Sequence, residues 1–303
     1  IMKVYVTAPN ENWILDRIKD GWRKNKPDLV VNSVHGCDII WFLDSYSWKN
    51  VPFQVLKSKK VVASIHHVVP SKFNLKDFKM RDTIVDHYHV PCEQTRDFIK
   101  QHTVKPIHKL GYWCEADLWV PYDHDQAKKE FGLENKFVVG SFQRDTEGSD
   151  LTSPKLEKGP DLLCDYLERI KTDKLHVLLG GWRRQYVISR LKKAKIPFTY
   201  HKMAPLDQLR RMYAACDLYV VSSRYEGGPQ ALMEASFMKV PIISTDVGMA
   251  KDVLNDNCVI DIESGLYMPT KKDVEACFKK VQKYNIIEHV DRYEKLFNKI
   301  IEE

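Results

Sequence analysis

The sequence lacks the features of a membrane-spanning, secreted or zinc-stabilised protein. No apolar run approaches the roughly eighteen residues that cross a bilayer, and no basic-then-apolar signal region opens the chain. The seven cysteines are widely spaced, and no two form a Cys-x-x-Cys pair. This pattern argues against a disulfide framework or a zinc site and favours buried thiols in a reducing compartment. We therefore expect a cytoplasmic protein, with Met2 rather than Ile1 as its native first residue.

Two further ligand signatures are missing or incomplete. The glycines of "LLGGWRR" follow a β-rich run but lack the GxGxxG spacing, so a nicotinamide fingerprint is absent. The acidic triplets Asp123–Asp125 and Asp261–Glu263 have the spacing of a metal-binding Asp-x-Asp, but neither follows a strand in a nucleotide-binding position. We expect no metal there. His87 and His89 alternate along a predicted strand, which favours a structural role.

Charge is distributed unevenly along the 303 residues. Residues 1–110 contain 18 Lys and Arg against 11 Asp and Glu, whereas residues 111–303 contain 29 against 30. A basic first part suits an anionic membrane, a phosphorylated acceptor or nucleic acid, although a merely solvated face explains it too. Because no base-stacking motif accompanies the charge, we do not expect nucleic acid as a partner.

Short β-rich runs and amphipathic helical runs alternate over the first 110 residues. The predicted strands are "MKVYVTAP", "CDIIWFL", "KKVVASI", "TIVDHYHVP" and "VKPIHKL", and the predicted helices are "ENWILDRIKDGWRKN" and "PCEQTRDFIKQH". The first of these helices has its apolar positions at Trp13, Ile14, Leu15 and Ile18. Alternation of strands and helices implies right-handed crossovers and a mostly parallel sheet.

A second alternation begins after Gly132. It has strands "KFVVGSF", "LHVLLGG", "FTYH", "DLYVVSS" and "VPIISTD", and helices "GPDLLCDYLERIK", "WRRQYVISRLKKAK", "PLDQLRRMYAAC" and the tail "EHVDRYEKLFNKIIEE". Residues 111–131 lack clear periodicity and are expected to connect two domains. The sequence therefore predicts two doubly wound α/β domains in tandem, with a ligand at the carboxyl ends of strands in a cleft between them.

The stretch "SSRYEGGPQALMEASF", Ser222–Phe237, places one carboxylate before a helix start and a second inside the helix. Pro229 suits the first turn, and Gly227 and Gly228 let a ligand approach the backbone. The helix start favours an anion such as a diphosphate, so Glu226 is better suited to a neutral hydroxylated group. Glu234 is either an exposed residue or a buried acceptor for hydroxyls. A plain helix start remains the alternative for the whole stretch.

With "PLDQLRRMYAACDLYVVSSR" before it and "VPIISTDVGMAKDVL" after it, this stretch closely resembles the donor-binding half of retaining glycosyltransferases of family 4, also called glycosyl transferases group 1. The resemblance implies the GT-B fold, in which two Rossmann-like domains face each other across a cleft. It implies an acceptor-side domain over 1–112, a donor domain over 113–283 and a helix over 284–303 that packs back on the first domain.

The family signature is a Glu, seven residues and a second Glu, which Glu226 and Glu234 match. By resemblance, Glu226 contacts hydroxyls of the transferred sugar and Glu234 binds the ribose hydroxyls of the nucleotide. Gly227, Gly228, Pro229 and Gln230 would line the diphosphate and sugar. Many family members have an aromatic residue or Gly-Phe-Gly after the first Glu, whereas this chain has Gly-Gly-Pro-Gln, so the sugar is not predicted.

Further candidates follow from the same resemblance. "VVGSFQRD" and "KLEKGPDLL" match the region of a basic pair, Arg144 and Lys158, whose charges would stabilise the departing diphosphate. "VVASIHHVVP" resembles the family's His-Asp-x-x-Pro segment, so His66 would reach the sugar, with His67 where Asp is frequent. The base pocket would lie around "FTYHKMAP", and Gly248 matches a glycine loop that faces the ligand; the base-pocket candidates are Tyr200, His201, Lys202 and Met203.

The implied reaction is sugar transfer from a UDP- or GDP-sugar to a glycan, lipid-linked or other hydroxyl acceptor, with retained configuration and without a metal or other cofactor. A nucleotide-sugar epimerase or hydrolase on the same scaffold is one alternative, and a catalytically silent sugar-nucleotide binder is another. The segment "RIKDGWRKNK" mixes aromatic and basic residues, and either a peripheral contact with an anionic membrane or a solvated helix explains it.

Overall fold

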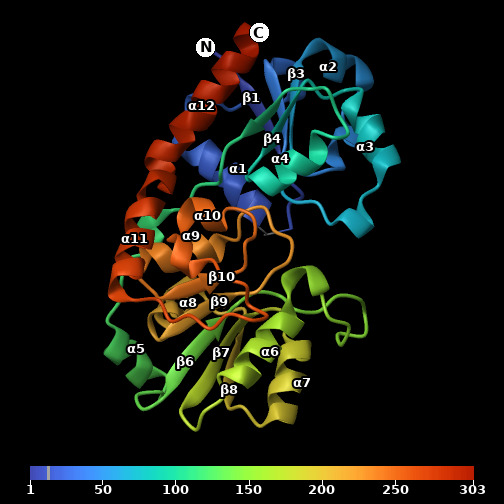
Figure 1. The fold of residues 1–303 in the computed structure, drawn as a ribbon. Coiled ribbons are helices and arrows are strands. Elements are labelled where there is room, and N and C mark those ends of the chain that lie inside the picture. The colour runs from blue at the N-terminus through green and yellow to red at the C-terminus, as the bar shows by residue number, and fades with distance from the viewer. Residues whose placement is uncertain (12–13) are drawn as a thin grey trace. The chain divides into compact units, whose positions relative to one another are not determined.

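The computed structural model describes residues 1–11 and 14–303 (Figure 1). The chain divides into two compact units, one formed by residues 1–115 with 283–303 and the other by residues 116–282. Trp13, which we expected in the first helix, lies outside the described residues. Among the described residues, the helices are too short or too polar to cross a bilayer.

The first unit is built on a five-stranded parallel sheet. Its strands, in spatial order, are β1 (Val4–Thr7), β2 (Ile39–Phe42), β3 (Lys60–Ser64), β4 (His87–Val90) and β5 (Ile107–Lys109). Val30 forms a further parallel bridge with Val4. After β1 the chain therefore returns on the outer side of β1 and then crosses to β2. The winding direction reverses between β1 and β2, and ligands bind at such switch points in open α/β sheets.

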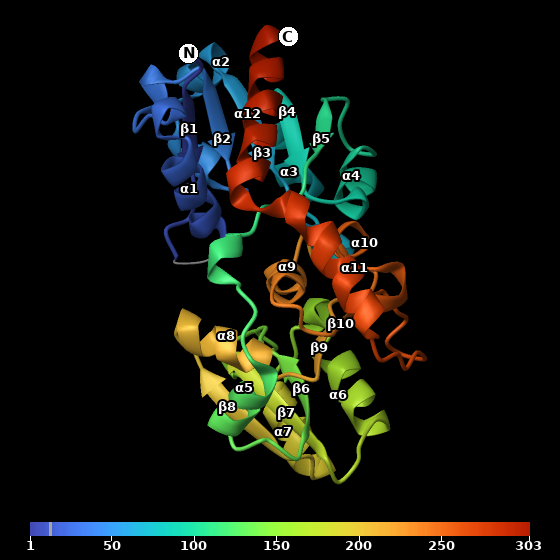
Figure 2. The same cartoon turned by 90° about the vertical axis from the view of Figure 1, so that its left-hand side faces the viewer.

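Helices cover both faces of this sheet. On one face, α2 (Phe53–Ser58), α3 (Leu75–Asp82) and α4 (Glu93–Ile99) contribute to an apolar cluster that includes Ile40, Val61 and Tyr88. On the other face lie α1 (Ile14–Asn25) and the long α12 (Ile286–Glu302), as Figure 2 shows. Aromatic rings join these layers, because Trp22 lies 5.4 Å from Phe297 and Trp41 lies 5.5 Å from Tyr293, measured between ring centroids.

A buried hydrogen-bonded chain crosses the α12 side of the sheet. The Trp41 indole donates to Ser64 Oγ (2.8 Å), and Ser64 Oγ lies 2.8 Å from His89 Nδ1. His89 Nε2 lies 2.7 Å from the Leu110 carbonyl oxygen, so Nε2 carries the proton and Nδ1 accepts from Ser64. Burial lowers the pKa of His89 to about 3. His89 is therefore a neutral structural histidine, as its alternation along the strand favoured.

The second unit also contains five parallel strands, in the order β10 (Ile242–Ser244), β9 (Leu218–Val221), β6 (Phe137–Ser141), β7 (Leu175–Gly181) and β8 (Phe198–Lys202). The chain winds from β6 outward to β8 and then returns to β9 on the other side of β6. The switch point of this sheet thus lies between β6 and β9, and its ligand site is expected at their carboxyl ends.

The helices of the second unit pack in pairs around this sheet. The pairs are α6 (Pro160–Arg169) with α7 (Gln185–Ala194), α5 (His124–Glu130) with α8 (Leu206–Ala214), and α9 (Gln230–Phe237) with α11 (Lys271–Val281), while α10 (Ala250–Val253) lies against α9 and α11. The α6–α7 side encloses a core of mainly aliphatic side chains that includes Leu163, Leu179 and Val220. The two doubly wound sheets confirm the predicted fold class.

Two expectations about local structure have different outcomes. All seven cysteines are buried and form no disulfide, which confirms the prediction of buried thiols. Residues 111–131, which we expected to connect the two domains, contain the helix α5 despite their lack of periodicity. This helix begins at an Asp123 cap, whose carboxylate accepts from the Gln126 amide at 2.7 Å. It buries only Ala127 and Lys128, so its sequence carries no apolar periodicity.

Candidate active site

Two loops at the switch point of the second unit bring a cation and a carboxylate together. Lys158 ends a short 3-10 helix (Leu156–Lys158), and Glu226 lies in the loop that follows β9. Lys158 Nζ forms an ion pair with Glu226 Oε1, and Ser223 Oγ donates to the same oxygen at 3.2 Å. The two paired side chains are 21% and 12% exposed. The pair is therefore held in place and remains within reach of a ligand.

The backbone conformation beside this pair requires a glycine at position 159. Gly159, directly after Lys158, has a φ of +60°, and a Cβ added there would collide with the Ser222 carbonyl oxygen. The Arg224 amide donates to the Glu157 carbonyl at 2.8 Å. Only glycine allows this close approach in the left-handed region. The glycine after the lysine thus fixes the start of α6 against the end of β9.

The second glutamate of the signature is buried inside α9. Glu234 is 6% exposed, and its Oε2 accepts a hydrogen bond from the Tyr213 hydroxyl at 2.8 Å. Burial, together with the nearby negative charge of Glu234, raises the pKa of Tyr213 well above its ordinary value. The phenol therefore stays protonated and acts as a fixed donor that orients the carboxylate. Glu234 is a buried acceptor, which excludes the alternative of an exposed helix residue.

The glycine-rich loop before α9 is closely packed. Gly248 has a φ of +55°, and a Cβ there would collide with the Gly227 carbonyl oxygen. The side-chain nitrogen Nε2 of Gln230, the first residue of α9, is buried and has no hydrogen-bond partner among the described residues. A buried amide donor without a partner requires an explanation, and a ligand acceptor supplies one. Pro229, which we expected in the first turn, lies at the N-cap directly before the helix.

Arg144, the predicted second cation, lies against other residues. Its Nε donates to the Thr146 carbonyl at 2.8 Å, and its guanidinium lies 5.2 Å from the centre of the Trp182 ring. Within the described part of the chain it forms no ion pair with a carboxylate. Burial and the neighbouring Arg183 lower the pKa of Arg144. The structure thus brings Lys158 and Glu226 together without Arg144.

The predicted base-pocket residues lie on and after β8, an edge strand of the sheet. The Tyr200 hydroxyl donates to the Gly181 carbonyl at 3.0 Å. His201 Nδ1 is 3.1 Å from the Gln208 amide nitrogen, while His201 Nε2 is buried without a hydrogen-bond partner in the described chain. Lys202 and Met203 are exposed. Their role in binding a base stays a prediction.

His66 and His67 follow β3 in the first unit. His66 Nδ1 pairs with the Tyr112 hydroxyl and Nε2 with the Leu43 carbonyl oxygen, so both ring nitrogens have partners. Burial lowers the pKa of His66 to about 4, so the ring is neutral at physiological pH. His67 is exposed. A catalytic role for His66 stays a prediction. In this conformation both of its ring nitrogens are already hydrogen-bonded, so a ligand would contact the edge of the ring.

Three residues of the site were not found by sequence reasoning. Gln143 donates to the Lys158 carbonyl at 2.9 Å and accepts from Ser223 at 3.3 Å, so it joins the ends of β6 and β9. Tyr213 orients Glu234, as described above. The only sequence signal of Gln143 and Ser223 is position, since Gln143 directly follows the predicted strand "KFVVGSF" and Ser223 ends the predicted strand "DLYVVSS".

Comparison with known proteins agrees with this geometry. Residues 153–297 match the model of the family described as "Glycosyl transferases group 1", and this segment includes Lys158, Glu226 and Glu234. The chain is 22% identical over 184 residues to the amylovoran biosynthesis glycosyltransferase AmsD of Erwinia amylovora, a match that covers 52% of each chain. It is 26% identical over 132 residues to glycogen synthase 2 of Geobacter metallireducens, covering 42% of this chain and 27% of that protein. The chain thus spans about half or less of the length of these curated relatives.

Solved structures show the same fold. The crystal structure of Anabaena HepE in complex with UDP and glucose superposes with a TM-score of 0.76 at 12% identity, covering 99% of this chain and all of that chain. Sucrose-phosphate synthase from Thermosynechococcus elongatus gives a TM-score of 0.69 at 14% identity, covering 97% and 80%. These structures show that the chain shares their two-unit α/β fold, and residues 153–297 are similar to the glycosyl transferases group 1, the class that the two glutamates indicated.

Proposed function

We propose that this chain transfers a sugar from a nucleoside-diphosphate donor to a hydroxyl of a glycan, lipid-linked or other acceptor, with retention of configuration and without a metal ion. The observation that carries the proposal is the ion pair between Lys158 and Glu226 at the switch point of the second sheet. A cation and a carboxylate at one point suit a ligand that is anionic at one end and hydroxylated at the other.

The donor would extend along the stretch that ends at α9. Glu226 would accept hydrogen bonds from the sugar, and the buried carboxylate of Glu234 would accept them from the ribose. The diphosphate would lie on Gly227–Gln230, where the unpartnered Gln230 amide and the first-turn amides of α9 can donate. Tyr200–Met203 and Gly248 would complete the donor site, and their contacts with the base are part of the proposal.

Lys158 supplies the electrostatic contribution to the reaction. As the bond between the sugar and the diphosphate breaks, negative charge develops on the leaving oxygen, and a fixed ammonium stabilises it. The acceptor hydroxyl would attack from the same face, and the departing diphosphate would take its proton. Arg144 would add a second positive charge after leaving the Trp182 ring, and His66 would contact the sugar. The protein thus acts by positioning and charge stabilisation.

Uridine diphosphate is the donor nucleotide that the comparisons favour. HepE was crystallised with UDP and glucose and also with UDP-glucose, and those ligands belong to that protein. We extend the nucleotide to this chain as a proposal and keep GDP as the alternative. The identity of the sugar is left to experiment because Gly-Gly-Pro-Gln differs from the commoner family pattern.

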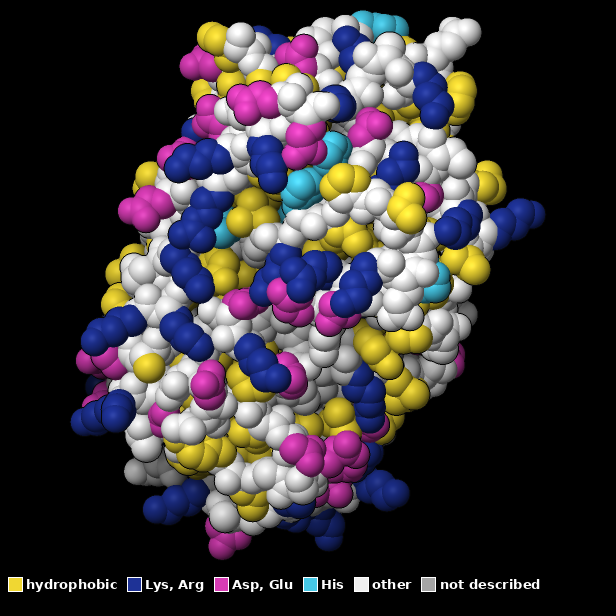
Figure 3. All heavy atoms as spheres, turned by 45° about the horizontal axis from the view of Figure 1, so that its top comes forward, with side chains coloured by type: hydrophobic (Ala, Val, Ile, Leu, Met, Phe, Trp, Pro, Cys, Tyr) yellow, Lys and Arg dark blue, Asp and Glu magenta, His cyan; other side chains and the backbone are white. Residues whose placement is uncertain are grey.

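We further propose a cytoplasmic location with peripheral contact at the membrane. The basic composition of residues 1–110 supports such a contact. On the face shown in Figure 3, however, Lys and Arg are interspersed with Asp and Glu. Sedimentation with vesicles of anionic lipid tests the contact, and equal sedimentation with neutral vesicles would contradict it.

The proposed reaction is tested by following a UDP-sugar with proton NMR, first alone and then with a panel of glycan acceptors. Transfer with retention predicts stable donor alone and a new glycoside of unchanged anomeric configuration with an acceptor. Free sugar or an isomerised donor in the absence of acceptor would indicate a hydrolase or an epimerase instead. Tight donor binding with no product on any acceptor would indicate a silent binder.

A further inference from the structure

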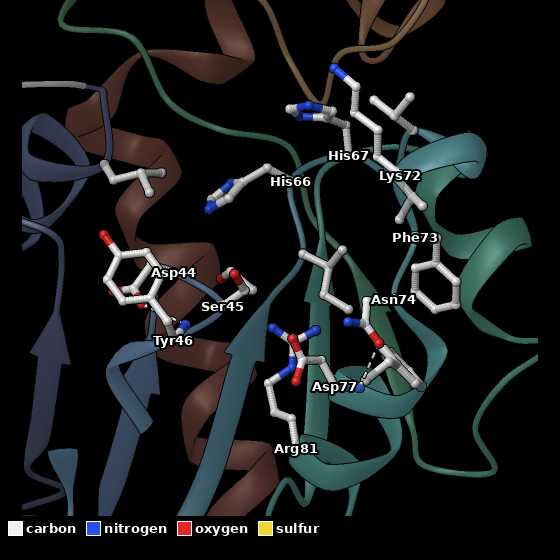
Figure 4. Close-up of a pocket in the computed structure, with 16 residues that line it drawn as sticks. Asp44, Ser45, Tyr46, His66, His67, Lys72, Phe73, Asn74, Asp77 and Arg81 are labelled. Atoms are coloured by element: carbon white, nitrogen blue, oxygen red, sulfur yellow. Dashed lines mark hydrogen bonds between the residues drawn. The ribbon is translucent and has the colours of Figure 1, made fainter. Parts of the chain in front are cut away.

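The first unit contains a cavity of about 470 Å³ at the carboxyl end of its sheet. Its wall includes Leu15 of α1, the residues Asp44–Tyr46 after β2, those from His66 to Val69 after β3, and the inner side of α3 (Figure 4). It therefore lies beside the switch point between β1 and β2, where ligands enter sheets of this kind. Its volume is in the range of small-molecule sites.

A buried arginine forms the floor of this cavity. Arg81, in the last turn of α3, is 7% exposed, and Figure 4 shows its guanidinium pointing into the cavity between Ser45 and Asn74. Its Nε is buried without a hydrogen-bond partner, and no carboxylate of the described residues lies within ion-pair distance of it. A buried charge is costly unless an opposite charge and hydrogen bonds compensate it. Arg81 interacts with the Tyr88 side chain by a hydrogen bond, and its remaining guanidinium donors can bind an anion.

The acidic groups around the cavity do not supply that anion. Asp44 is buried, and its Oδ1 accepts from the amides of Tyr46 (2.9 Å) and Ser47 (2.6 Å), while Oδ2 accepts from the Ser47 hydroxyl. Its carboxylate is therefore engaged in its own turn. Asp77 is exposed on α3 and forms no ion pair with Arg81 among the described residues. Burial lowers the pKa of the Arg81 guanidinium, and the nearby charges of Asp44 and Asp77 oppose this effect. Both carboxylates make the electrostatic potential in the cavity more negative. A bound anion must therefore contact the Arg81 guanidinium directly.

Asn74 adds a neutral donor on the same side. Its Oδ1 caps α3 by accepting from the Asp77 amide at 3.0 Å, which leaves the side-chain nitrogen directed toward the cavity (Figure 4). Arg81 and Asn74 line the same cavity as the apolar side chains of Ile65 and Phe78. Donors of this kind fit the oxygens of a phosphate or a carboxylate.

We propose that this cavity, called the Arg81 pocket, binds the phosphate or carboxylate of an anionic acceptor, held by the Arg81 guanidinium and the Asn74 amide. Naming the ligand as the acceptor rests on the proposed function, in which the donor diphosphate occupies Lys158 in the other unit. Binding of the anion itself needs no transfer activity, and it is tested without donor.

The test is a titration of isoleucine-methyl-labelled protein, followed by NMR, with glucose 6-phosphate, methyl glucuronide and methyl glucoside at constant ionic strength. Ile65 lines the pocket, and Ile243, buried in the second unit, reports distant effects. We expect saturable shifts of the Ile65 methyl with at least one anionic sugar and none with methyl glucoside. Response to glucose 6-phosphate alone identifies a phosphate, and response to methyl glucuronide alone identifies a carboxylate. Equal responses to the neutral and anionic sugars would overturn the proposal.

Variants assign the binding to Arg81. Arg81→Gln should weaken the binding of the anionic sugar about tenfold or more, since a hydrogen bond to a charged group is lost. Arg81→Lys keeps the charge and should weaken it less, and Lys76→Gln removes one exposed charge from the same helix and should change nothing. Unchanged affinity in a folded Arg81→Gln protein would refute the assignment. Separate addition of UDP distinguishes the two proposals, because donor binding can fail while Ile65 still responds to the anion.

Discussion

Lys158 Nζ and Glu226 Oε1 form an ion pair although the two residues lie 68 positions apart in the sequence. The pair joins the start of α6 to the loop after β9, and Ser223 supports its carboxylate. Partly shielded pairs of this kind hold two opposite charges at a defined point. In the proposed function the donor separates their roles, because the diphosphate binds the lysine and the sugar hydroxyls bind the glutamate.

The first prediction concerns the leaving group. Lys158→Ala should lower turnover about a hundredfold or more and weaken donor binding by less than about tenfold, since the ammonium acts on charge that develops in the transition state. Release of nucleoside diphosphate measures turnover, and calorimetry measures donor binding. Lys171→Ala, which removes an exposed lysine beyond the end of α6, is the control. Unchanged turnover of Lys158→Ala would remove the lysine from the mechanism.

The second prediction concerns the hydroxyl that orients Glu234. Tyr213→Phe removes the 2.8 Å hydrogen bond while keeping the ring, so donor affinity should fall about fivefold. Tyr166→Phe removes a hydroxyl from another buried tyrosine on α6 and should leave donor affinity unchanged. Equal affinities for Tyr213→Phe and the wild type would show that the carboxylate is held without this hydroxyl.

The third prediction concerns the glycine beside Lys158. Gly159→Ala adds a Cβ against the Ser222 carbonyl in left-handed backbone and should lower the free energy of unfolding by about 3 kcal/mol or more. Gly132 has a similar φ of +67° with no atom within 4 Å of an added Cβ, so Gly132→Ala should cost only about 1 to 2 kcal/mol. Urea denaturation measures both. Equal losses would mean that the loop after β9 yields to the added methyl group.

The fourth prediction concerns pH. The pKa of His89 is about 3 in the folded chain and near its ordinary 6.5 in the unfolded chain. As the pH falls, the unfolded state is therefore protonated at a higher pH than the folded state. The contribution of His89 to stability is therefore present above pH 6.5 and is lost progressively as the pH falls toward 3, at about 1.4 kcal/mol per pH unit. Denaturation between pH 7.5 and 5 should show a smaller pH dependence for His89→Gln than for the wild type. His35→Gln, at an exposed site, should keep the wild-type dependence, and equal dependence in all three proteins would contradict the assignment.

Most strands could be predicted from the sequence because each is a short β-branched or aromatic run. "LHVLLGG" coincides with β7, "FTYH" lacks only Lys202 of β8, and the other predicted strands contain the observed ones. Helices such as α3 and α5 were not predicted because they bury few apolar groups; α3 buries only Phe78 and Arg81. The reversal between β1 and β2 depends on the single bridge of Val30, which forms no recognisable run.

The candidate site, too, could be predicted from the sequence only in part. The spacing of Glu226 and Glu234 indicated a class of protein because the motif is local. The pairing of Glu226 with Lys158 and the contact of Glu234 with Tyr213 arise from segments that meet only in the folded unit. Arg81 had no sequence signal, since an arginine near a helix end is ordinarily exposed. Its burial is a property of packing on the sheet.

The most direct test of the central claim is calorimetric titration of the wild type, Glu226→Gln and Glu234→Gln with UDP and UDP-sugars. The account predicts that the wild type binds UDP, that Glu234→Gln weakens UDP about tenfold or more, and that Glu226→Gln does not weaken UDP but loses the added affinity of the sugar. Glu275→Gln, on the exposed surface of α11, should match the wild type. Absence of binding to every UDP-, GDP- and ADP-sugar, or undiminished UDP binding by Glu234→Gln, would contradict it.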